Sequence, residues 1–240
     1  VNGDDANSMK AVANQKGKKI ITFGLSEDND YYANNIEHIS GMQTDYSLMS
    51  GGKELTRISI HVPGDHNVLN SLAACVAAME CGITADKLAH GIQGFRGAGR
   101  RFELLKVVNG ITIVDDYAHH PAELTVTLEA AKNLHFNRVW AVFQPFTYSR
   151  TAALLDDFAT ALKIADKVVL TEIMGSREKN TYNIYSSDLA KEIPNSEWFS
   201  TFDEVASYVA DNASEGDLVI TLGCGDVYKV AKILIDKLEG

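Results

Sequence analysis

The strongest constraint on the fold is a regular alternation of short apolar runs and amphipathic segments through the C-terminal part of the chain. The runs RVWAVFQP (138–145), DKVVLTEI (166–173) and DLVITLG (217–223) each have the length of a buried strand. Each is followed by a segment whose apolar residues recur at helical spacing. Strands that alternate with helices predict a mostly parallel, doubly wound sheet with helices on both faces. We therefore expect an α/β fold for this part of the chain.

One antiparallel strand pair is expected at the start of this region. The segment FELLKVVNGITIVDD (102–116) contains two apolar runs separated by Asn109-Gly110. Both residues tolerate the positive φ that a type I′ hairpin turn requires. The stretch TAALLDDFATALKIA (151–165) further on predicts one continuous helix.

The first hundred residues have a different pattern. Residues 31–62 alternate between apolar and polar side chains, with GGK (51–53) as a turn, which predicts an antiparallel β-meander. KKIITFGL (18–25) predicts a buried strand before the meander. Two helices are expected after it, at 64–82 and 84–95, with Gly82 as the residue that ends the first.

RGAGRR (96–101) interrupts these patterns, because glycine-rich segments break regular structure. We expect two domains, residues 1–99 and 100–240. The chain starts at Val1 with VNGDD, which has the composition of a strand end. This start favours a first domain that is truncated.

Composition excludes several classes of function. A formal net charge of −10 argues against a broad nucleic-acid-binding surface. No apolar run approaches the length of a membrane span, and no signal peptide is recognisable. The three cysteines have no metal-ligand spacing, and an odd count fits a reducing compartment. We expect a cytoplasmic protein that binds neither nucleic acid nor membranes.

The stretch DDYAHHP (115–121) concentrates ionisable side chains at the end of an apolar run. Adjacent strand residues point to opposite faces, and no HExxH or cysteine–histidine set is present, so we expect no metal site. Asp116 and Tyr117 can simply form a turn, with Pro121 in the first turn of a helix. The carboxyl end of a strand is also where open α/β sheets bind ligands, and we favour a binding role.

The stretch FQPFTYSRT (143–151) repeats this arrangement one strand–helix unit later. Ser149 or Thr151 can cap the helix that follows. Arg150 is oddly placed for the helix dipole, because helix N-termini prefer anions. It therefore either pairs with a nearby carboxylate, such as Asp156 or Asp157, or holds the carboxylate of a ligand in a bidentate contact.

Three further segments offer binding groups. TLGCGD (221–226) places two glycines between a strand and a helix, which indicates a tight turn more than a dinucleotide site. Asn67 and Asn70 lie three apart on one helix face and suit a purine edge, unless Asp65 or Asn67 caps that helix. GRRFE (99–103) offers an arginine pair that either clamps phosphate or is solvated.

Together, and in this order, HVPGDHNVLNSLAA, GAGRRFE, DDYAHHPAE, FQPFTYSRT and LGCGD resemble the Mur ligase family over essentially the whole chain. The resemblance implies that residues 1–99 are the C-terminal part of the central ATPase domain. Residues 100–240 would be the complete Rossmann-like domain that binds the amino acid. The UDP-binding domain is missing, and no G-K-S or G-K-T phosphate loop occurs in the 240 residues. We therefore expect this chain to be a ligase fragment that is inactive alone.

Within the family, the chain most resembles ligases that add L-alanine to the carboxylate of UDP-N-acetylmuramate during synthesis of the peptidoglycan precursor. The resemblance implies that ATP activates this carboxylate as an acyl phosphate, with Mg²⁺ bound mainly outside this chain. UDP-N-acetylmuramate, L-alanine and ATP would be its small-molecule partners. Two alternatives stay open: a related ligase that attaches a preformed peptide, and a non-catalytic α/β module that binds a nucleotide or a partner.

The resemblance also implies roles for individual residues. Those expected at ATP are Asn67 and Asn70 at adenine, Arg101 at phosphate, and Asp116 at the ribose or nucleotide region. Those expected around the amino acid are Tyr117, His119 and Arg150, of which His119 and Arg150 would be catalytic. One departure concerns Phe146-Thr147, where relatives often carry basic residues. This difference leaves Arg150 as the main carboxylate partner of its loop.

Overall fold

The structure, a computed structural model, describes residues 1–39 and 42–240. These residues form two compact units, Val1–Arg96 and Gly97–Gly240. The boundary between these units, after Arg96, and the one expected from the sequence, after residue 99, both lie in the segment RGAGRR (96–101). No helix in the part of the chain that the structure describes has the length and apolar character to cross a membrane.

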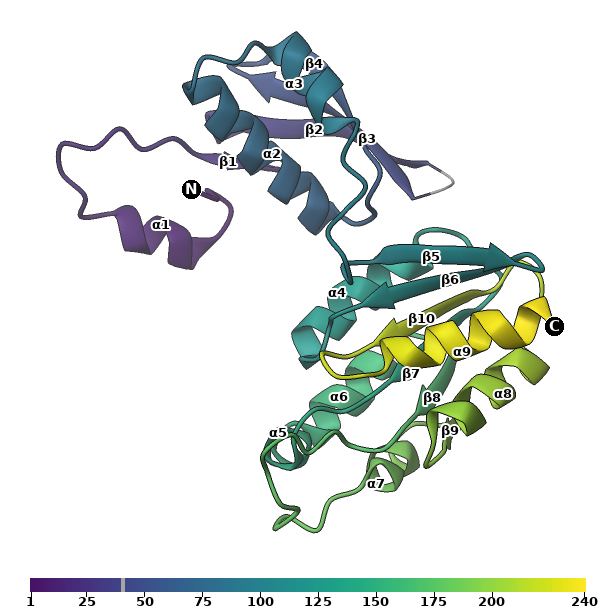
Figure 1. The fold of residues 1–240 in the computed structure, drawn as a ribbon. Coiled ribbons are helices and arrows are strands. Elements are labelled where there is room, and N and C mark those ends of the chain that lie inside the picture. Colours follow the sequence, from purple (N-terminus) through teal and green to yellow (C-terminus); the bar gives the residue numbers. More distant parts are fainter. Residues whose placement is uncertain (40–41) are drawn as a thin grey trace. The chain divides into compact units, whose positions relative to one another are not determined.

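The first unit contains a four-stranded sheet in the order β1-β2-β3-β4 (Figure 1). Its strands are β1 (Phe23–Gly24), β2 (Tyr31–Ile39), β3 (Gln43–Ser50) and β4 (Lys53–Ile60). β1 runs parallel to β2, while β2, β3 and β4 pair antiparallel, which confirms the predicted meander. Its residues 40 and 41 lie outside the described residues. Gly51 and Gly52 make the turn before β4 with φ of +56° and +74°.

The helices of the first unit are α1 (Ala6–Val12), α2 (Asp65–Glu80) and α3 (Ala85–Ile92). α2 and α3 lie on one face of the sheet and bury apolar side chains there, among them Val68 and Leu72 from α2. Burial of such side chains removes apolar surface from water and holds the helices on the sheet. α2 ends as predicted, with Gly82 at φ +90° just beyond it.

Two details of the first unit differ from the prediction. The predicted strand 18–25 is reduced to Phe23–Gly24, and Lys18, Lys19 and Ile20 are exposed. Neither Asp65 nor Asn67 caps α2, because Gly64 occupies the cap position and no side chain bonds the free N–H groups there. Within the apolar run 18–25, only Phe23 and Gly24 pair with a neighbouring strand, β2, so only these two residues form a strand.

The second unit contains a six-stranded sheet in the order β5-β6-β10-β7-β8-β9 (Figure 1). Its strands are β5 (Glu103–Val108), β6 (Ile111–Asp116), β7 (Val139–Phe143), β8 (Lys167–Leu170), β9 (Ser196–Trp198) and β10 (Leu218–Leu222). β5 and β6 form the predicted hairpin, in which Asn109 and Gly110 have φ of +50° and +75°. All other pairs are parallel, which confirms the mostly parallel sheet.

Helices cover both faces of this sheet. They are α4 (Pro121–Lys132), α5 (Tyr148–Ala153), α6 (Leu155–Leu162), α7 (Ser186–Lys191), α8 (Phe202–Asn212) and α9 (Tyr228–Glu239). α4 and α6 pack together on one face, while α8 and α9 pack together on the other. The continuous helix predicted for 151–165 is wrong, since the chain breaks at Leu154 (φ −121°) and forms α5 and α6 instead.

The position of β10 determines where a ligand can enter this sheet. β10 lies between β6 and β7 and runs parallel to both. The chain leaves β10 for α9 on one face, whereas it leaves β6 and β7 for α4 and α6 on the other face. In open α/β folds, the carboxyl edge of the sheet at the point where successive loops diverge in this way is the usual ligand site.

Candidate functional site at the carboxyl edge of the second sheet

Three of the motifs found in the sequence follow three adjacent strands of the second unit. DDYAHHP ends β6, GCGD follows β10, and QPFTYSR follows β7. Hydrogen bonds join the loops: the Gly223 N–H donates to the Asp116 carbonyl at 3.1 Å, and the Asp226 N–H donates to Gln144 Oε1 at 3.0 Å. The structure therefore brings these motifs together at one edge of the sheet.

The glycines of GCGD make a tight turn. Gly223 has φ of +146°, a conformation that other residues rarely adopt. A Cβ at Gly225 would collide with the side chains of Gln144 and Met174. Gly223 is thus required by the backbone conformation, and Gly225 by the close packing of the loops after β10 and β7. Both agree with the tight turn expected from the sequence.

Arg100 binds the loops of β6 and β10 together. Its Nε donates to Asp115 Oδ2 at 2.8 Å, and its Nη2 donates to the Gly223 carbonyl at 2.6 Å. The guanidinium carbon lies 5.0 Å from the ring centroid of Tyr117 and 5.1 Å from that of Tyr228. Arg100 is thus committed to contacts inside the unit, and the interpretation of both arginines as one phosphate clamp is wrong for Arg100.

Asp116 is buried and shapes the turn after β6. Its Oδ1 accepts the Ala118 N–H and its Oδ2 accepts the Phe102 N–H, both at 2.7 Å. Burial raises the pKa of Asp116 above its ordinary value, although both N–H groups and the charge of Arg101 act in the opposite direction. The carboxylate thus performs the turn-forming role that the sequence allowed.

Tyr117, His119 and Arg101 form a patch beside this turn. The guanidinium carbon of Arg101 lies 5.3 Å from the ring centroid of Tyr117, and the His119 ring meets the Tyr117 ring edge-on at 5.5 Å. Arg101 is exposed and forms no ion pair with another described residue. Its charge is therefore available to an anionic ligand.

His119 and His120 have different roles at the start of α4. His120 caps the helix, with its Nδ1 accepting the Ala122 N–H at 3.4 Å, and Pro121 is the first helical residue, as predicted. His119 Nδ1 lies 3.0 Å from the Tyr117 carbonyl oxygen and 3.2 Å from Glu123 Oε2. The structure therefore separates the two histidines: the Nδ1 atom of His120 caps the helix, whereas the Nδ1 atom of His119 faces Tyr117 and Glu123.

Arg150 lies in α5 with an unsatisfied donor. Its Nη1 is buried and has no hydrogen-bond partner among the described residues. No ion pair joins it to Asp156 or Asp157 within residues 1–39 and 42–240, so this alternative to a ligand contact is not observed. A buried guanidinium nitrogen without a partner is costly, and a ligand carboxylate would satisfy it.

Glu178, which the sequence analysis missed, holds the first turn of α5. Its Oε1 accepts Ser149 Oγ at 2.6 Å, and its Oε2 accepts the Ser149 N–H at 2.9 Å. These bonds, with the charge of Arg150 as a smaller cause, lower the pKa of Glu178. The predicted capping of the helix by Ser149 or Thr151 is wrong, because Ser149 lies inside the helix and Thr151 Oγ1 donates to the Thr147 carbonyl at 2.7 Å.

The cap position of α5 is strained. Thr147 has φ of +66° and ψ of 141°, a conformation that is rare for a β-branched residue. Its N–H donates to the Met174 carbonyl at 2.9 Å, which fixes the loop after β7 against the segment after β8. Strained backbone of this kind concentrates at functional sites, and here it directly precedes the helix of Arg150.

The thiol of Cys224, in the loop after β10, is influenced by charged side chains from several loops of this edge. Burial raises the pKa of its thiol, whereas the nearby positive charges of Arg150 and Arg100 lower it and the charge of Glu123 raises it. All three charges therefore act on one position in the loop after β10. The edge combines the unpaired Nη1 of Arg150, the exposed Arg101 and the imidazole of His119. Such a set suits an anionic substrate that gains or loses a proton.

Asn67 and Asn70 belong to the first unit. They lie on one face of the first turn of α2, where Asn70 Nδ2 donates to Asn67 Oδ1 at 3.3 Å and Asn67 Nδ2 donates to the Pro63 carbonyl at 2.8 Å. Asn70 is exposed, and its carboxamide oxygen has no partner among the described residues. The pair therefore keeps an acceptor for a ligand on its outer side.

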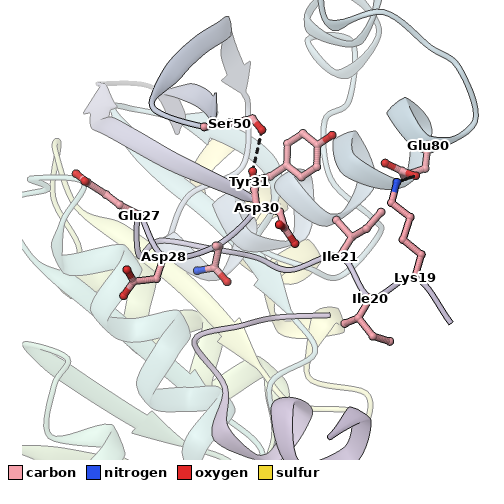
Figure 2. A pocket seen from close by; sticks show the side chains of 11 residues that line it. Lys19, Ile20, Ile21, Glu27, Asp28, Asp30, Tyr31, Ser50 and Glu80 are labelled. Atoms are coloured by element: carbon pink, nitrogen blue, oxygen red, sulfur yellow. Dashed lines mark hydrogen bonds and ion pairs between the residues drawn. The ribbon is translucent and has the colours of Figure 1, made fainter. Parts of the chain in front are cut away.

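The first unit also has an open hollow, which Figure 2 shows. Lys19 reaches Glu80 across it at 2.8 Å, and Ser50 Oγ donates to the Asp30 carbonyl at 2.9 Å. The hollow is lined by Lys19, Ile20, Ile21, Glu27, Asp28, Asn29, Asp30, Tyr31, Ser50, Gly51 and Glu80. Acidic side chains dominate this list, so the hollow would repel phosphate groups. None of the site residues expected from the sequence lies in it.

No group of three or more histidine, cysteine, aspartate or glutamate side chains in the described ranges is arranged to hold a metal ion. The donors in DDYAHHP illustrate the reason. Asp115 and Asp116 direct their oxygens at Arg100, Thr221 and backbone N–H groups, so the two carboxylates do not converge.

Comparison with known proteins identifies both units. The Mur ligase middle domain matches residues 1–78, and the domain described as Mur ligase, glutamate ligase domain, matches residues 100–225. A UDP-N-acetylmuramate–L-alanine ligase from Caldanaerobacter subterraneus subsp. tengcongensis is 40% identical over 238 residues, which are 98% of this chain and 52% of that protein. The corresponding ligase of Agathobacter rectalis is 41% identical over 224 residues, 92% of this chain and 49% of that protein.

A solved structure agrees with these relatives. The crystal structure of UDP-N-acetylmuramate–alanine ligase from Thermotoga maritima matches with a TM-score of 0.76 and 26% identity, over 91% of this chain and 48% of that one. The chain thus spans about half the length of the curated relatives it matches. Because the domain that matches residues 100–225 covers more than half of the sequence, the chain belongs to the Mur ligase family.

Proposed function

We propose that this chain is the part of an ATP-dependent ligase that joins L-alanine to the carboxylate of UDP-N-acetylmuramate. Residues 1–99 would belong to the central ATPase domain, and residues 100–240 would form the domain that binds the amino acid. The names of the relatives support the substrates, and the share of their length that is matched supports a fragment. The reaction would take place in the cytoplasm, as a step in the synthesis of the peptidoglycan precursor.

One observation carries the proposal for the second unit. Arg150 Nη1 is buried without a hydrogen-bond partner, at the edge of the sheet where open α/β folds bind ligands. The α-carboxylate of an amino acid has the charge and the planar shape that a guanidinium binds best. In the proposed site Arg150 holds this carboxylate, and Tyr117 and His119 surround the rest of the amino acid.

Two residues of the first unit, Asn67 and Asn70, and two of the second, Arg101 and Asp116, would serve ATP. The outer face of Asn67 and Asn70 suits the donor and acceptor edge of adenine. Arg101, exposed and free of ion pairs with described residues, would meet a phosphate, and the turn built on Asp116 would support the ribose or nucleotide region. Mg²⁺ would be held mainly by residues outside this chain.

The chemistry of the proposed reaction fits such a site. The muramate carboxylate attacks the terminal phosphorus of ATP, which gives an acyl phosphate and ADP. The amine of alanine then attacks the acyl carbon, and the tetrahedral intermediate expels phosphate. Positioned reactants and fixed positive charges supply most of the catalysis in steps of this kind. Arg150 would contribute to positioning, because binding the α-carboxylate of alanine also fixes the position of its amine.

The proposal is tested with the full-length protein that contains this chain. ADP release is measured with ATP, UDP-N-acetylmuramate and L-alanine together, and then with each omitted in turn. We expect release only when all three are present, with one alanine incorporated into the sugar nucleotide for each ADP formed. Release that depends on a preformed peptide would identify a peptide-adding ligase instead. Nucleotide binding without any turnover would identify a non-catalytic module.

The 240-residue chain by itself serves as the control. It has no G-K-S or G-K-T sequence to cradle the β- and γ-phosphates, so we expect no alanine-dependent ADP release from it. Alanine-dependent ADP release by the 240-residue chain alone would contradict the proposal that ATP hydrolysis needs a phosphate loop outside this chain.

A further inference from the structure

We propose that Glu123 is a positioning residue that keeps His119 protonated on Nδ1, so that His119 Nε2 can accept a proton from the ammonium group of the incoming amino acid. This inference rests on the proposed function, and it assigns the histidine a specific atom and a specific step. It also gives a role to Glu123, the last residue of the stretch DDYAHHPAE.

The position of the proton follows from the two atoms that face Nδ1. One is the Tyr117 carbonyl oxygen at 3.0 Å, and the other is Glu123 Oε2 at 3.2 Å. A carbonyl oxygen carries no hydrogen and can only accept. The Glu123 carboxylate also accepts the His119 backbone N–H at 2.9 Å. With two acceptors in front of it, Nδ1 must be the donor and must carry a hydrogen.

The carboxylate is ionised in this arrangement. Partial burial would raise the pKa of Glu123, but hydrogen bonds from the backbone N–H groups of His119 and His120 and the charge of Arg101 act to lower it, and the pKa lies below its ordinary value. An ionised carboxylate is an acceptor only, so it cannot supply the hydrogen in place of the imidazole.

The other ring nitrogen is then determined as well. A neutral imidazole with a hydrogen on Nδ1 has its lone pair on Nε2. No hydrogen bond or ion pair engages Nε2 within the described ranges, and the side chain is 24% exposed. The edge-on Tyr117 ring, at 5.5 Å and 80°, limits rotation of the imidazole. Nε2 is therefore oriented and accessible as a proton acceptor.

The local sequence explains how Glu123 reaches this position. His120 is the helix cap and Pro121 the first helical residue, so Glu123 is the third. A glutamate at the third position reaches back to the backbone before the helix, as in a capping box. Here the same carboxylate also touches the imidazole, which reproduces the arrangement of a base and its orienting acid.

The proposed reaction needs an acceptor of this kind. The α-amino group of an amino acid is mostly an ammonium ion at neutral pH, and an ammonium nitrogen has no lone pair with which to attack. One N–H bond breaks, its hydrogen forms a bond to Nε2, and the electron pair stays on the amine. That pair then forms the C–N bond at the acyl carbon. Phosphate leaves with the electrons of the C–O bond and takes up the second proton of the attacking nitrogen, which gives the neutral amide and hydrogen phosphate. The imidazolium that results is stabilised by Glu123.

The first test reads the proton position directly in the 240-residue chain. Histidine is labelled with ¹⁵N, and two-bond ¹H–¹⁵N correlation spectra report which ring nitrogen carries the hydrogen. His119→Gln identifies the signal of His119. We expect the hydrogen on Nδ1, and a shift of population toward Nε2–H in Glu123→Gln, because the amide can donate to Nδ1. Glu129→Gln is the matched control, since Glu129 is an exposed carboxylate on the same helix.

A hydrogen on Nε2 of His119 in the unmodified chain would overturn the proposal, and so would identical spectra for the chain and Glu123→Gln. Both readings are independent of ligase activity. They decide the role of Glu123 even if the protein were to use another amine or none.

The second test measures catalysis in the full-length protein. Glu123→Gln should lower kcat for alanine roughly tenfold or more, a part of the 10²–10⁴-fold that general acid–base catalysis contributes, while KM for ATP stays unchanged. Glu129→Gln should match the unmodified enzyme. A glutamate that only caps the helix predicts a lower melting temperature with unchanged kcat below that temperature, and this outcome would contradict the inference. If the unmodified enzyme shows no alanine dependence, the proposed function fails, while the proton position remains decided by the spectra.

Discussion

The Arg100 guanidinium donates to the Asp115 carboxylate at 2.8 Å, and Asp115 is only 2% exposed. Asp115 also accepts the Thr221 hydroxyl at 2.6 Å, so the buried carboxylate is shared between β6, β10 and the segment before β5. The backbone of Arg100 has a positive φ of +58°. The first residues of the second unit are therefore part of the structure that holds the loops of the site together.

Arg100→Ala should lower the free energy of unfolding of the chain by about 2–4 kcal/mol, because it leaves a buried carboxylate without its charged partner. Urea denaturation followed by circular dichroism measures this change. Arg101→Ala is the matched control. It removes the same side chain from the next position, where no ion pair with a described residue is lost, and should cost about 0.5 kcal/mol or less. Equal effects of both substitutions would show that the Arg100–Asp115 contact is not a stabilising one.

Much of the second unit could be predicted because its strands are buried on both faces. β6, β7 and β10 consist of buried residues throughout, and such strands appear in the sequence as continuous apolar runs. The turn at Asn109-Gly110 was equally clear, since few residues accept positive φ at both positions. The alternation of strands and helices also predicted that the three candidate motifs would meet at the carboxyl edge of the sheet.

The details that the sequence did not reveal depend on residues far apart in the chain. The break at Leu154 interrupts a pattern that is apolar on both sides of it, so periodicity could not locate it. Glu178 caps the helix of Ser149 from 29 residues away, and Arg100 reaches Gly223 from 123 residues away. Local propensity contains no information about such contacts. The assignment of ligands to Asn67, Arg101, Tyr117, His119 and Arg150 stays a prediction that the resemblance supplied.

The free energy of unfolding should depend on pH through the ionisation of the buried Asp217. Burial would raise its pKa, but hydrogen bonds from Arg138, the Ser214 N–H and Trp140 lower it below the ordinary value of 3.8. A carboxyl group with a lowered pKa contributes stability above its ordinary pKa and loses it as the pH falls. Asp217→Asn should therefore cost about 2–3 kcal/mol at pH 7 and clearly less near pH 3, as measured by urea denaturation across this range. A cost independent of pH would contradict the ion pair.

Asp116 should behave in the opposite sense. Its pKa is raised, mainly by burial, so the folded chain binds this proton more tightly than the unfolded chain does. Its contribution to stability must then decrease as the pH rises from about 3.8 through the raised pKa. The cost of Asp116→Asn should be largest in acid and smaller at pH 7, the reverse of Asp217→Asn. The same denaturation series measures both variants, and parallel pH profiles would refute the assignment for Asp116.

The two units should separate under limited proteolysis. Residues 93–99 form no helix or strand, and they connect units that each have their own buried core. We expect the first cuts in this segment and survival of a fragment that contains residues 104–240, because loops cut more readily than packed elements. Mass spectrometry of early digestion products identifies the cuts. Degradation of the C-terminal unit before the N-terminal one would contradict an independent fold for residues 104–240.

The central claim is that Arg150 binds the carboxylate of the amino acid, and steady-state kinetics of Arg150→Lys in the full-length protein tests it most directly. Lysine keeps the charge but loses the two-pronged geometry, and loss of a charge-assisted hydrogen bond costs about 1.5–3 kcal/mol. We expect KM for alanine to rise about ten- to a hundredfold, with KM for ATP and the melting temperature nearly unchanged. A well-folded Arg150→Lys protein with an unchanged KM for alanine would remove Arg150 from the site and contradict the account.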